Sequence, residues 1–158
     1  MKKLLLPIVA ALAVSACSSI TDECITIDST PRGAVVVVND EVKGTTPLNV
    51  CLPRDGTFEV KLVKEGYKDE NVTFTSLKDD TFIKFGPLVD MGYYKTLTPS
   101  NEKNEMTPKF LPPYKGTKAF EDMQKNLDTV DQLKKDGKIN ASEHSYMIKK
   151  IIEFYSAK

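Results

Sequence analysis

The sequence predicts an α+β protein: a small antiparallel β-sandwich, then an extended linker, then a C-terminal two-helix hairpin. Three observations predict this order. Short runs of alternating apolar residues lie between proline and glycine turns in the first half of the chain. Four prolines, at positions 99, 108, 112 and 113, follow among polar residues. In the last 42 residues the apolar period changes from two to 3.6.

Composition limits what the chain can be. Its 158 residues include 22 basic and 22 acidic side chains, and 41% of them are hydrophobic. That is room for one modest domain or two very small ones, which excludes a large enzyme. A net charge of zero supplies no general attraction for a polyanion, so we predict no nucleic-acid partner.

The N-terminus has the pattern of an export signal. Lys2 and Lys3 precede an eleven-residue apolar run, Leu4 to Val14, which ends at Ser15 and Ala16. As a helix this run would extend about 16 Å, whereas a bilayer core is roughly 30 Å thick. The run is therefore too short to span a membrane.

The sequence Val-Ser-Ala-Cys at positions 14–17 resembles the lipobox of bacterial lipoproteins. The resemblance implies a signal peptide at 1–16, a lipid on Cys17, a lipidated tether at 17–22 and binding to the membrane through that lipid. Ser18 after the cysteine implies the periplasmic leaflet of the outer membrane. An ordinary signal peptide with a coincidental cysteine is the alternative.

Cys24 and Cys51 are predicted to form a disulfide, because an exported chain enters an oxidising compartment. Closing their 27-residue separation would stabilise the fold by about 3.5 kcal/mol on a chain-entropy estimate. Two buried thiols are the alternative. No zinc site is expected, since His144 is the only histidine and is far from both cysteines in sequence.

Short strands are predicted throughout Glu23 to Leu77. The expected strands lie at 24–28, 34–38, 48–52 and 57–62, and positions 42–43 lead into a turn at 44–47. Asn39-Asp40-Glu41 is a turn of hairpin type between two of them.

The turns of this region carry a family resemblance. Their motifs are Thr-Pro-Arg-Gly-Ala at 30–34, Gly-Thr-Thr-Pro-Leu at 44–48, Gly56 and Lys-Glu-Gly-Tyr at 64–67. In this order they resemble a PEGA domain, with Arg32 where the name motif has glutamate. The resemblance implies a compact antiparallel sandwich of bacterial surface or envelope proteins, without catalytic residues.

The boundaries and side-chain roles after these turns are also expectations. We assign 23–97 to the PEGA-like sandwich and 98–116 to a proline-containing linker. Within the sandwich, the segment 81–94 is interpreted as a strand or extended arm over its open side rather than a membrane-dipping loop. Tyr67 is expected to bury its ring while its hydroxyl reaches a backbone group.

The hairpin, 117–158, contains two amphipathic helices. Thr117 is expected to cap the first, which ends at Gly137. Asn140 and Glu143 form a capping box for the second. Helices of this size cannot bury their apolar faces alone, so they must pack on each other and then on the sandwich, a second copy or another protein.

The segment 133–152 resembles a SHOCT-type helical hairpin, through Gly137, Ile139, Asn140 and Glu143, with His144 where that family tends to have phenylalanine. The resemblance implies an interaction or oligomerisation element. A calcium-binding loop is the alternative for the same turn. It would place Lys134 at a ligand position, and a lysine cannot bind calcium, so no metal site is predicted.

These features predict a non-enzymatic binding or assembly protein of the cell envelope. It would be lipid-anchored, with an envelope protein or a second copy bound through the hairpin, and with no catalytic residues and no cofactor. A phage- or prophage-encoded lipoprotein for superinfection exclusion is the alternative. A cell-wall-acting enzyme is the least favoured of the three hypotheses, because the sequence offers only one histidine, His144, for acid-base chemistry.

Overall fold

A computed structural model describes residues 21–78, 85–101 and 103–157. The predicted signal peptide and Cys17 lie outside the described residues. So does part of the apolar segment at 81–94.

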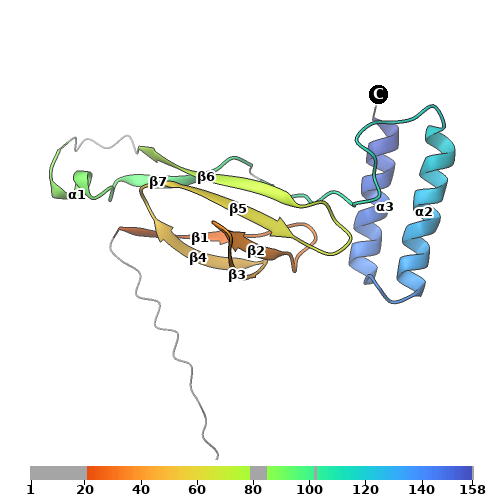
Figure 1. The fold of residues 1–158 in the computed structure, drawn as a ribbon, viewed down its shortest axis with the longest axis horizontal. Helices are drawn as coiled ribbons and strands as arrows, with labels where there is room; N and C mark the ends of the chain where they lie inside the picture. Colours follow the sequence, from red (N-terminus) through yellow and green to blue (C-terminus); the bar gives the residue numbers. More distant parts are fainter. Residues whose placement is uncertain (1–20, 79–84, 102, 158) are drawn as a thin grey trace, which may run out of the picture.

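The strands form two antiparallel sheets that face each other (Figure 1). A two-stranded ribbon consists of β1 (Asp22–Ile27) and β4 (Leu48–Pro53). A five-stranded sheet has the order β3-β2-β5-β6-β7. Its strands are β2 (Val35–Val38), β3 (Glu41–Thr45), β5 (Thr57–Val63), β6 (Glu70–Lys78) and β7 (Lys95–Pro99). The predicted fold class, an antiparallel sandwich followed by two helices, is confirmed.

Alternation of side chains builds the core between the sheets. Every second residue of a strand points to the same face, and the apolar ones point inward. On β5, Val60 and Leu62 are buried, and Val72 is buried beside Val60 on the neighbouring β6. The ribbon contributes Ile27 and Val50 to the same core.

Two turns show how local sequence shapes the sheet. Asn39 and Asp40 both have positive φ, 47° and 66°, which is the backbone of a tight two-residue hairpin between β2 and β3. Thr46 is buried, and its hydroxyl accepts a hydrogen bond from the Ala34 backbone N–H at 3.0 Å and lies 2.6 Å from the Ser29 hydroxyl. This threonine therefore has a structural role.

The described part of the segment expected to be a strand or extended arm, 85–94, contains a helix and a turn instead, and a strand follows it. Strand β7 pairs antiparallel with β6 and places Leu97 in the core. Thus it extends the sheet at its edge instead of covering an open side. Before it comes α1 (Pro87–Asp90), a single turn that the sequence did not predict.

Part of the proline-containing region is packed against the sandwich. Single β-bridges join Thr30 to Glu105 and Tyr67 to Pro108. Met106 and Leu111 are buried, as is Pro108. Residues 104–111 thus form a strap between sandwich and hairpin, because their apolar side chains have a core to enter.

The hairpin consists of α2 (Ala119–Lys135) and α3 (Ala141–Ser156). The capping box is confirmed: the Glu143 backbone N–H donates to Asn140 Oδ1 at 2.9 Å, and the Asn140 N–H donates to Glu143 Oε2 at 3.0 Å. The predicted cap of the first helix is wrong. Lys118 occupies the N-cap position without a side-chain hydrogen bond, so Thr117 lies one residue too early to serve.

The hairpin packs across one end of the sandwich (Figure 1). It covers the turn between β5 and β6 and the strap. The start of β1 and α1 lie at the opposite end. Since β6 has nine residues and a strand rises about 3.3 Å per residue, the two ends are roughly 30 Å apart.

Candidate functional site

Contacts between three strands form the end of the sandwich where the chain enters β1. The Arg54 backbone N–H donates to the Thr21 carbonyl at 2.8 Å. The Leu97 N–H donates to Glu23 Oε2 at 2.8 Å, and this carboxylate lies 3.9 Å from the Arg54 guanidinium. The same guanidinium lies over the Tyr93 ring, 5.7 Å from its centroid. We call this the entry end.

A second ion pair lies at the entry end. Lys95 Nζ lies 2.5 Å from Asp55 Oδ1. Gly92 is packed against the same aspartate: it has a φ of +74°, and an added Cβ would lie 3.3 Å from the Asp55 Cβ. A glycine is therefore required where the α1 loop crosses the β4–β5 turn.

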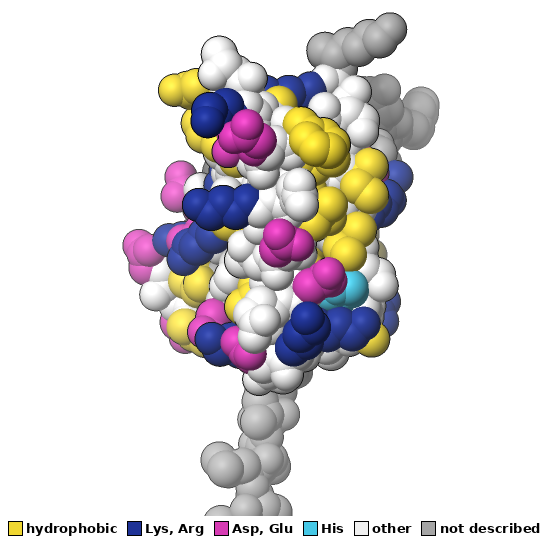
Figure 2. Space-filling model, turned by 90° about the vertical axis from the view of Figure 1, so that its right-hand side faces the viewer, with side chains coloured by type: hydrophobic (Ala, Val, Ile, Leu, Met, Phe, Trp, Pro, Cys, Tyr) yellow, Lys and Arg dark blue, Asp and Glu magenta, His cyan; other side chains and the backbone are white. Residues whose placement is uncertain are grey.

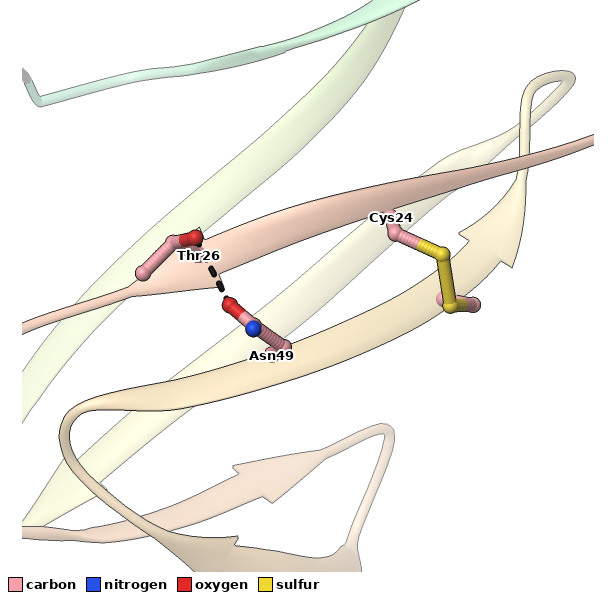
Figure 3. The surroundings of a disulfide bond; sticks show 4 residues. Cys24, Thr26 and Asn49 are labelled. Carbon is pink, nitrogen blue, oxygen red and sulfur yellow. Dashed lines mark hydrogen bonds between the residues drawn. A yellow bond between two sulfur atoms is a disulfide. The ribbon is translucent and has the colours of Figure 1, made fainter. Parts of the chain in front are cut away.

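The predicted disulfide between Cys24 and Cys51 is present. The two residues lie directly opposite each other on β1 and β4, and both are exposed on the outer face of the ribbon. Thr26 and Asn49, on the same face, make a 2.7 Å hydrogen bond two residues further along (Figure 3). The disulfide thus ties the ribbon from outside, leaving its inner face to the core.

At the other end, an ion pair joins sandwich and hairpin. Lys64 Nζ lies 3.0 Å from Glu143 Oε1, and the two side chains are only 17% and 14% exposed. Burial acts to raise the pKa of Glu143. The hydrogen bond from the Asn140 backbone and the nearby Lys64 ammonium outweigh burial, so this pKa lies below its ordinary value of 4.5.

The strap joins α3 through a second set of contacts. The Tyr146 hydroxyl donates to the Met106 carbonyl at 3.0 Å, and Lys150 forms an ion pair with Glu105. Burial acts to lower the pKa of Lys150, but the hydrogen bond to Glu105 and the negative charges nearby together outweigh burial, so the pKa is raised. The hairpin is therefore held by side chains from both the sandwich and the strap.

Tyr67 lies beneath this junction. Its ring is 1% exposed and its centroid lies 6.3 Å from that of Tyr146. The ring is buried as expected, but the predicted hydroxyl contact is wrong: the hydroxyl has no hydrogen-bond partner among the described residues. Burial, with the nearby Glu143 carboxylate, raises the pKa of Tyr67 strongly.

A groove runs between the outer face of the sandwich and the turn of the hairpin. It has a volume of about 550 Å³ and is lined on one side by Val35 and Val63 and on the other by Leu133 and Ile139. Lys64 also lines it. Its lining is therefore mixed, because the Lys64–Glu143 ion pair and other charged side chains lie beside the aliphatic residues.

The hairpin carries a stripe of apolar side chains in which Phe120 of α2 and Ile152 of α3 are exposed, while Leu127 of α2 and Ile148 of α3 are partly buried. Spacings of four and seven residues put each pair on one side of its helix. Phe120 is 73% exposed and Ile152 48%. Figure 2 shows hydrophobic side chains gathered on this face, with the single histidine at one end. We call these four residues the hairpin stripe.

His144 marks the end of the hairpin stripe. Its Nε2 lies 2.7 Å from Asp131 Oδ1, which joins the two helices near their connecting turn. Among the described residues no three His, Cys, Asp or Glu side chains gather where they could hold a metal ion. Nor does any helix in the described parts of the chain have the length and apolarity needed to cross a bilayer.

The fold defines the first part of the chain as a small disulfide-bonded antiparallel β-sandwich. The family model of the PEGA domain matches residues 23–86. This is the region that resembled the family by its turns, and the match is consistent with an extracellular or periplasmic binding module. The PEGA domain is not a known catalytic domain. No curated protein and no solved structure matches the chain.

The structure brings some predicted residues together and adds others. Cys24 and Cys51 were found from the sequence. Lys64 and Tyr146 were not identified as docking residues, because their partners lie 79 and 40 positions away in the chain. Lys64 belongs to the Lys-Glu-Gly-Tyr motif, which predicted a turn. The motif does not predict which residue the lysine contacts.

Proposed function

We propose that this protein is a lipid-anchored protein of the bacterial envelope that holds its C-terminal hairpin away from the membrane as a non-enzymatic binding element. One observation carries the proposal. The chain enters the sandwich at one end, at Thr21, and the hairpin is docked at the other. A lipid on Cys17 would therefore attach the entry end to the periplasmic leaflet of the outer membrane and leave the hairpin facing the periplasm.

The docking contacts support presentation of a fixed surface. The Lys64–Glu143 ion pair holds α3 on the sandwich and the Tyr146 hydrogen bond holds it on the strap. Val130 of α2 and Met147 and Ile151 of α3 are buried. Ordered side chains lose less conformational entropy on binding than mobile ones. The hairpin stripe is the apolar surface that this arrangement exposes to a protein partner, either an envelope protein or a second copy.

Membrane attachment is tested first. The full-length chain is expressed in a bacterium that exports lipoproteins, and the mature protein is analysed by intact-mass spectrometry and by separation of inner and outer membranes. We expect a diacylglycerol-bearing mass beginning at Cys17 and recovery in the outer membrane. Cys17→Ala should remove both. An unmodified wild-type protein in the soluble fraction would contradict the proposal.

The binding element is tested by photo-crosslinking in the same cells. A photoreactive phenylalanine analogue replaces Phe120, on the hairpin stripe. The matched control is Lys125, exposed on the same helix but about 140° around it. We expect a discrete crosslinked product from Phe120 only, and its loss in Ile152→Lys. A product of twice the monomer mass identifies a second copy; equal products from both positions would refute the stripe as the binding element.

A further inference from the structure

Four large apolar side chains project from the entry end. Phe85, Leu88, Met91 and Tyr93 are 85%, 40%, 45% and 38% exposed. They lie within nine consecutive residues around α1, a helix that has no buried residue. We call them the apolar tip. Single exposed apolar residues are ordinary, but a cluster of this kind marks an interaction surface.

The apolar tip lies beside the point where the chain enters the sandwich. Tyr93 is under the Arg54 guanidinium, and the Arg54 backbone N–H is hydrogen-bonded to Thr21. The backbone of Leu97, a little further along β7, is bound by Glu23 of β1. Figure 1 shows α1 and the start of β1 at the same end of the sandwich.

The short distance along the chain between Cys17 and β1 limits how far the entry end can lie from a lipid on Cys17. Cys17 precedes Asp22, the first residue of β1, by five positions. Five residues can span at most about 18 Å. A lipid on Cys17, the attachment given under the proposed function on which this inference rests, would keep the apolar tip next to the bilayer.

We propose that the apolar tip inserts into the interfacial layer of the membrane that holds Cys17, so that lipid is its occupant. Aromatic side chains such as Phe85 and Tyr93 favour the boundary between headgroups and acyl chains. Apolar faces of peripheral proteins enter this boundary by about 5–10 Å. Lipid and tip together form a two-point attachment, which orients the sandwich with its hairpin away from the membrane.

The charges around the apolar tip decide the kind of lipid contact. Arg54 and Lys95 are each paired with an acidic side chain, Glu23 and Asp55 respectively, and Asp90 of α1 is exposed. No excess of positive charge is left among these residues to attract anionic headgroups. Insertion is hydrophobic, so it occurs on vesicles of zwitterionic lipid and does not weaken with salt.

The experiment uses tryptophan fluorescence, because the chain contains no tryptophan. Phe85→Trp is made in the full-length acylated protein, which is reconstituted into phosphatidylethanolamine–phosphatidylcholine vesicles with or without brominated acyl chains. Lys125→Trp, exposed on α2 at the far end of the molecule and outside the hairpin stripe, is the matched control. We expect blue-shifted emission and strong bromine quenching for Phe85→Trp, unchanged in high salt, and water-like unquenched emission for Lys125→Trp.

The outcomes separate this inference from the proposed function. An acylated protein whose Phe85→Trp emission is water-like and unquenched overturns the apolar tip but leaves the anchor. Blue-shifted emission without bromine quenching shows that protein, for example a second copy, covers the tip, and this too overturns lipid insertion. A mass showing Cys17 unmodified overturns both. Leu88→Trp repeats the measurement should Phe85→Trp fail to fold.

Discussion

Glu143 uses its two carboxylate oxygens for two different structural tasks. Oε2 accepts the Asn140 backbone N–H at 3.0 Å and closes the capping box of α3, while Oε1 lies 3.0 Å from Lys64 Nζ on the sandwich. The residue that closes the capping box of α3 therefore also contributes to where that helix lies on the sandwich. Local helix formation and tertiary docking are coupled through one side chain.

Substitution of Glu143 should separate these two tasks. Glu143→Gln keeps an oxygen for the capping box but loses the ion pair, and we expect a loss of about 1 kcal/mol in unfolding free energy. Glu143→Ala loses both contacts, with an expected cost of about 2 kcal/mol. Urea denaturation followed by circular dichroism measures both values.

An exposed ion pair on the same hairpin serves as the control for the Lys64–Glu143 ion pair. Lys138 and Asp136 lie 3.9 Å apart with 66% and 39% of their side chains exposed, so Lys138→Met should change the unfolding free energy by less than about 0.5 kcal/mol. Equal effects of Glu143→Gln and Lys138→Met would show that the buried ion pair does not dock the hairpin.

Acid should weaken the docking of the hairpin. The pKa of Glu143 is lowered in the folded state, and so is that of Glu105, mainly through its hydrogen bond from Lys150. A lowered pKa means that the unfolded chain binds more protons than the folded one in acid. Their contribution to stability is thus complete above the ordinary carboxyl pKa of 4.5 and is lost as the pH falls below it.

Unfolding free energies measured between pH 7 and pH 3 test this prediction. We expect the decline below about pH 4.5 to be shallower in Glu143→Gln than in the wild type, because one of the two carboxylates is gone. Parallel curves for the two proteins would mean that Glu143 titrates alike in both states.

Tyr67, which is buried, and Tyr146, which is partly buried, should respond differently to loss of their hydroxyls. Tyr146→Phe removes the donor to the Met106 carbonyl and should cost about 1 kcal/mol. Tyr67→Phe removes a hydroxyl without a partner among the described residues and should be neutral or slightly stabilising. Thermal unfolding of both variants gives the comparison; a larger loss in Tyr67→Phe would reveal a bond to its hydroxyl.

The disulfide should stabilise the sandwich more than the hairpin. Replacement of Cys24 and Cys51 by serine removes the cross-link across 27 residues. We expect the unfolding free energy to fall by about 3.5 kcal/mol. Because both sulfurs lie on the outer face, the double variant leaves no cavity in the core. Hydrogen exchange should rise first in β1 and β4; a rise confined to α2 and α3 would contradict this assignment.

Local sequence predicted those elements whose causes are local. The turn at Asn39 and Asp40, the capping box at Asn140 and the end of the first helix before Gly137 depend on residues within a few positions of each other. All three are present. Thr117 failed as a cap because helix starts shift easily by a residue when no strong contact selects one.

The candidate surfaces were less accessible to sequence reasoning. The sequence predicted a strand or extended arm at 81–94 rather than a membrane-dipping loop, so it did not indicate the apolar tip. The placement of the tip beside the chain entry depends on the Arg54–Tyr93 contact, which spans 39 positions. For the hairpin stripe, the sequence predicted that each helix has an apolar face but not which residues of that face stay exposed. Which apolar residues enter the core, as Met147 does, and which stay outside, as Ile152 does, depends on what covers the helix.

The sequence by itself determined the composition of the layers: alternating strands, tight turns, a pair of cysteines and two capped amphipathic helices, all set by short-range preferences of the backbone. Only the tertiary structure decided that the hairpin docks on the sandwich, that residues 104–111 are a packed strap, and that the chain start and the hairpin lie at opposite ends. These depend on contacts such as Lys64 with Glu143 and Tyr146 with Met106. Their energy is gained only when distant segments meet, so no short window of sequence records them.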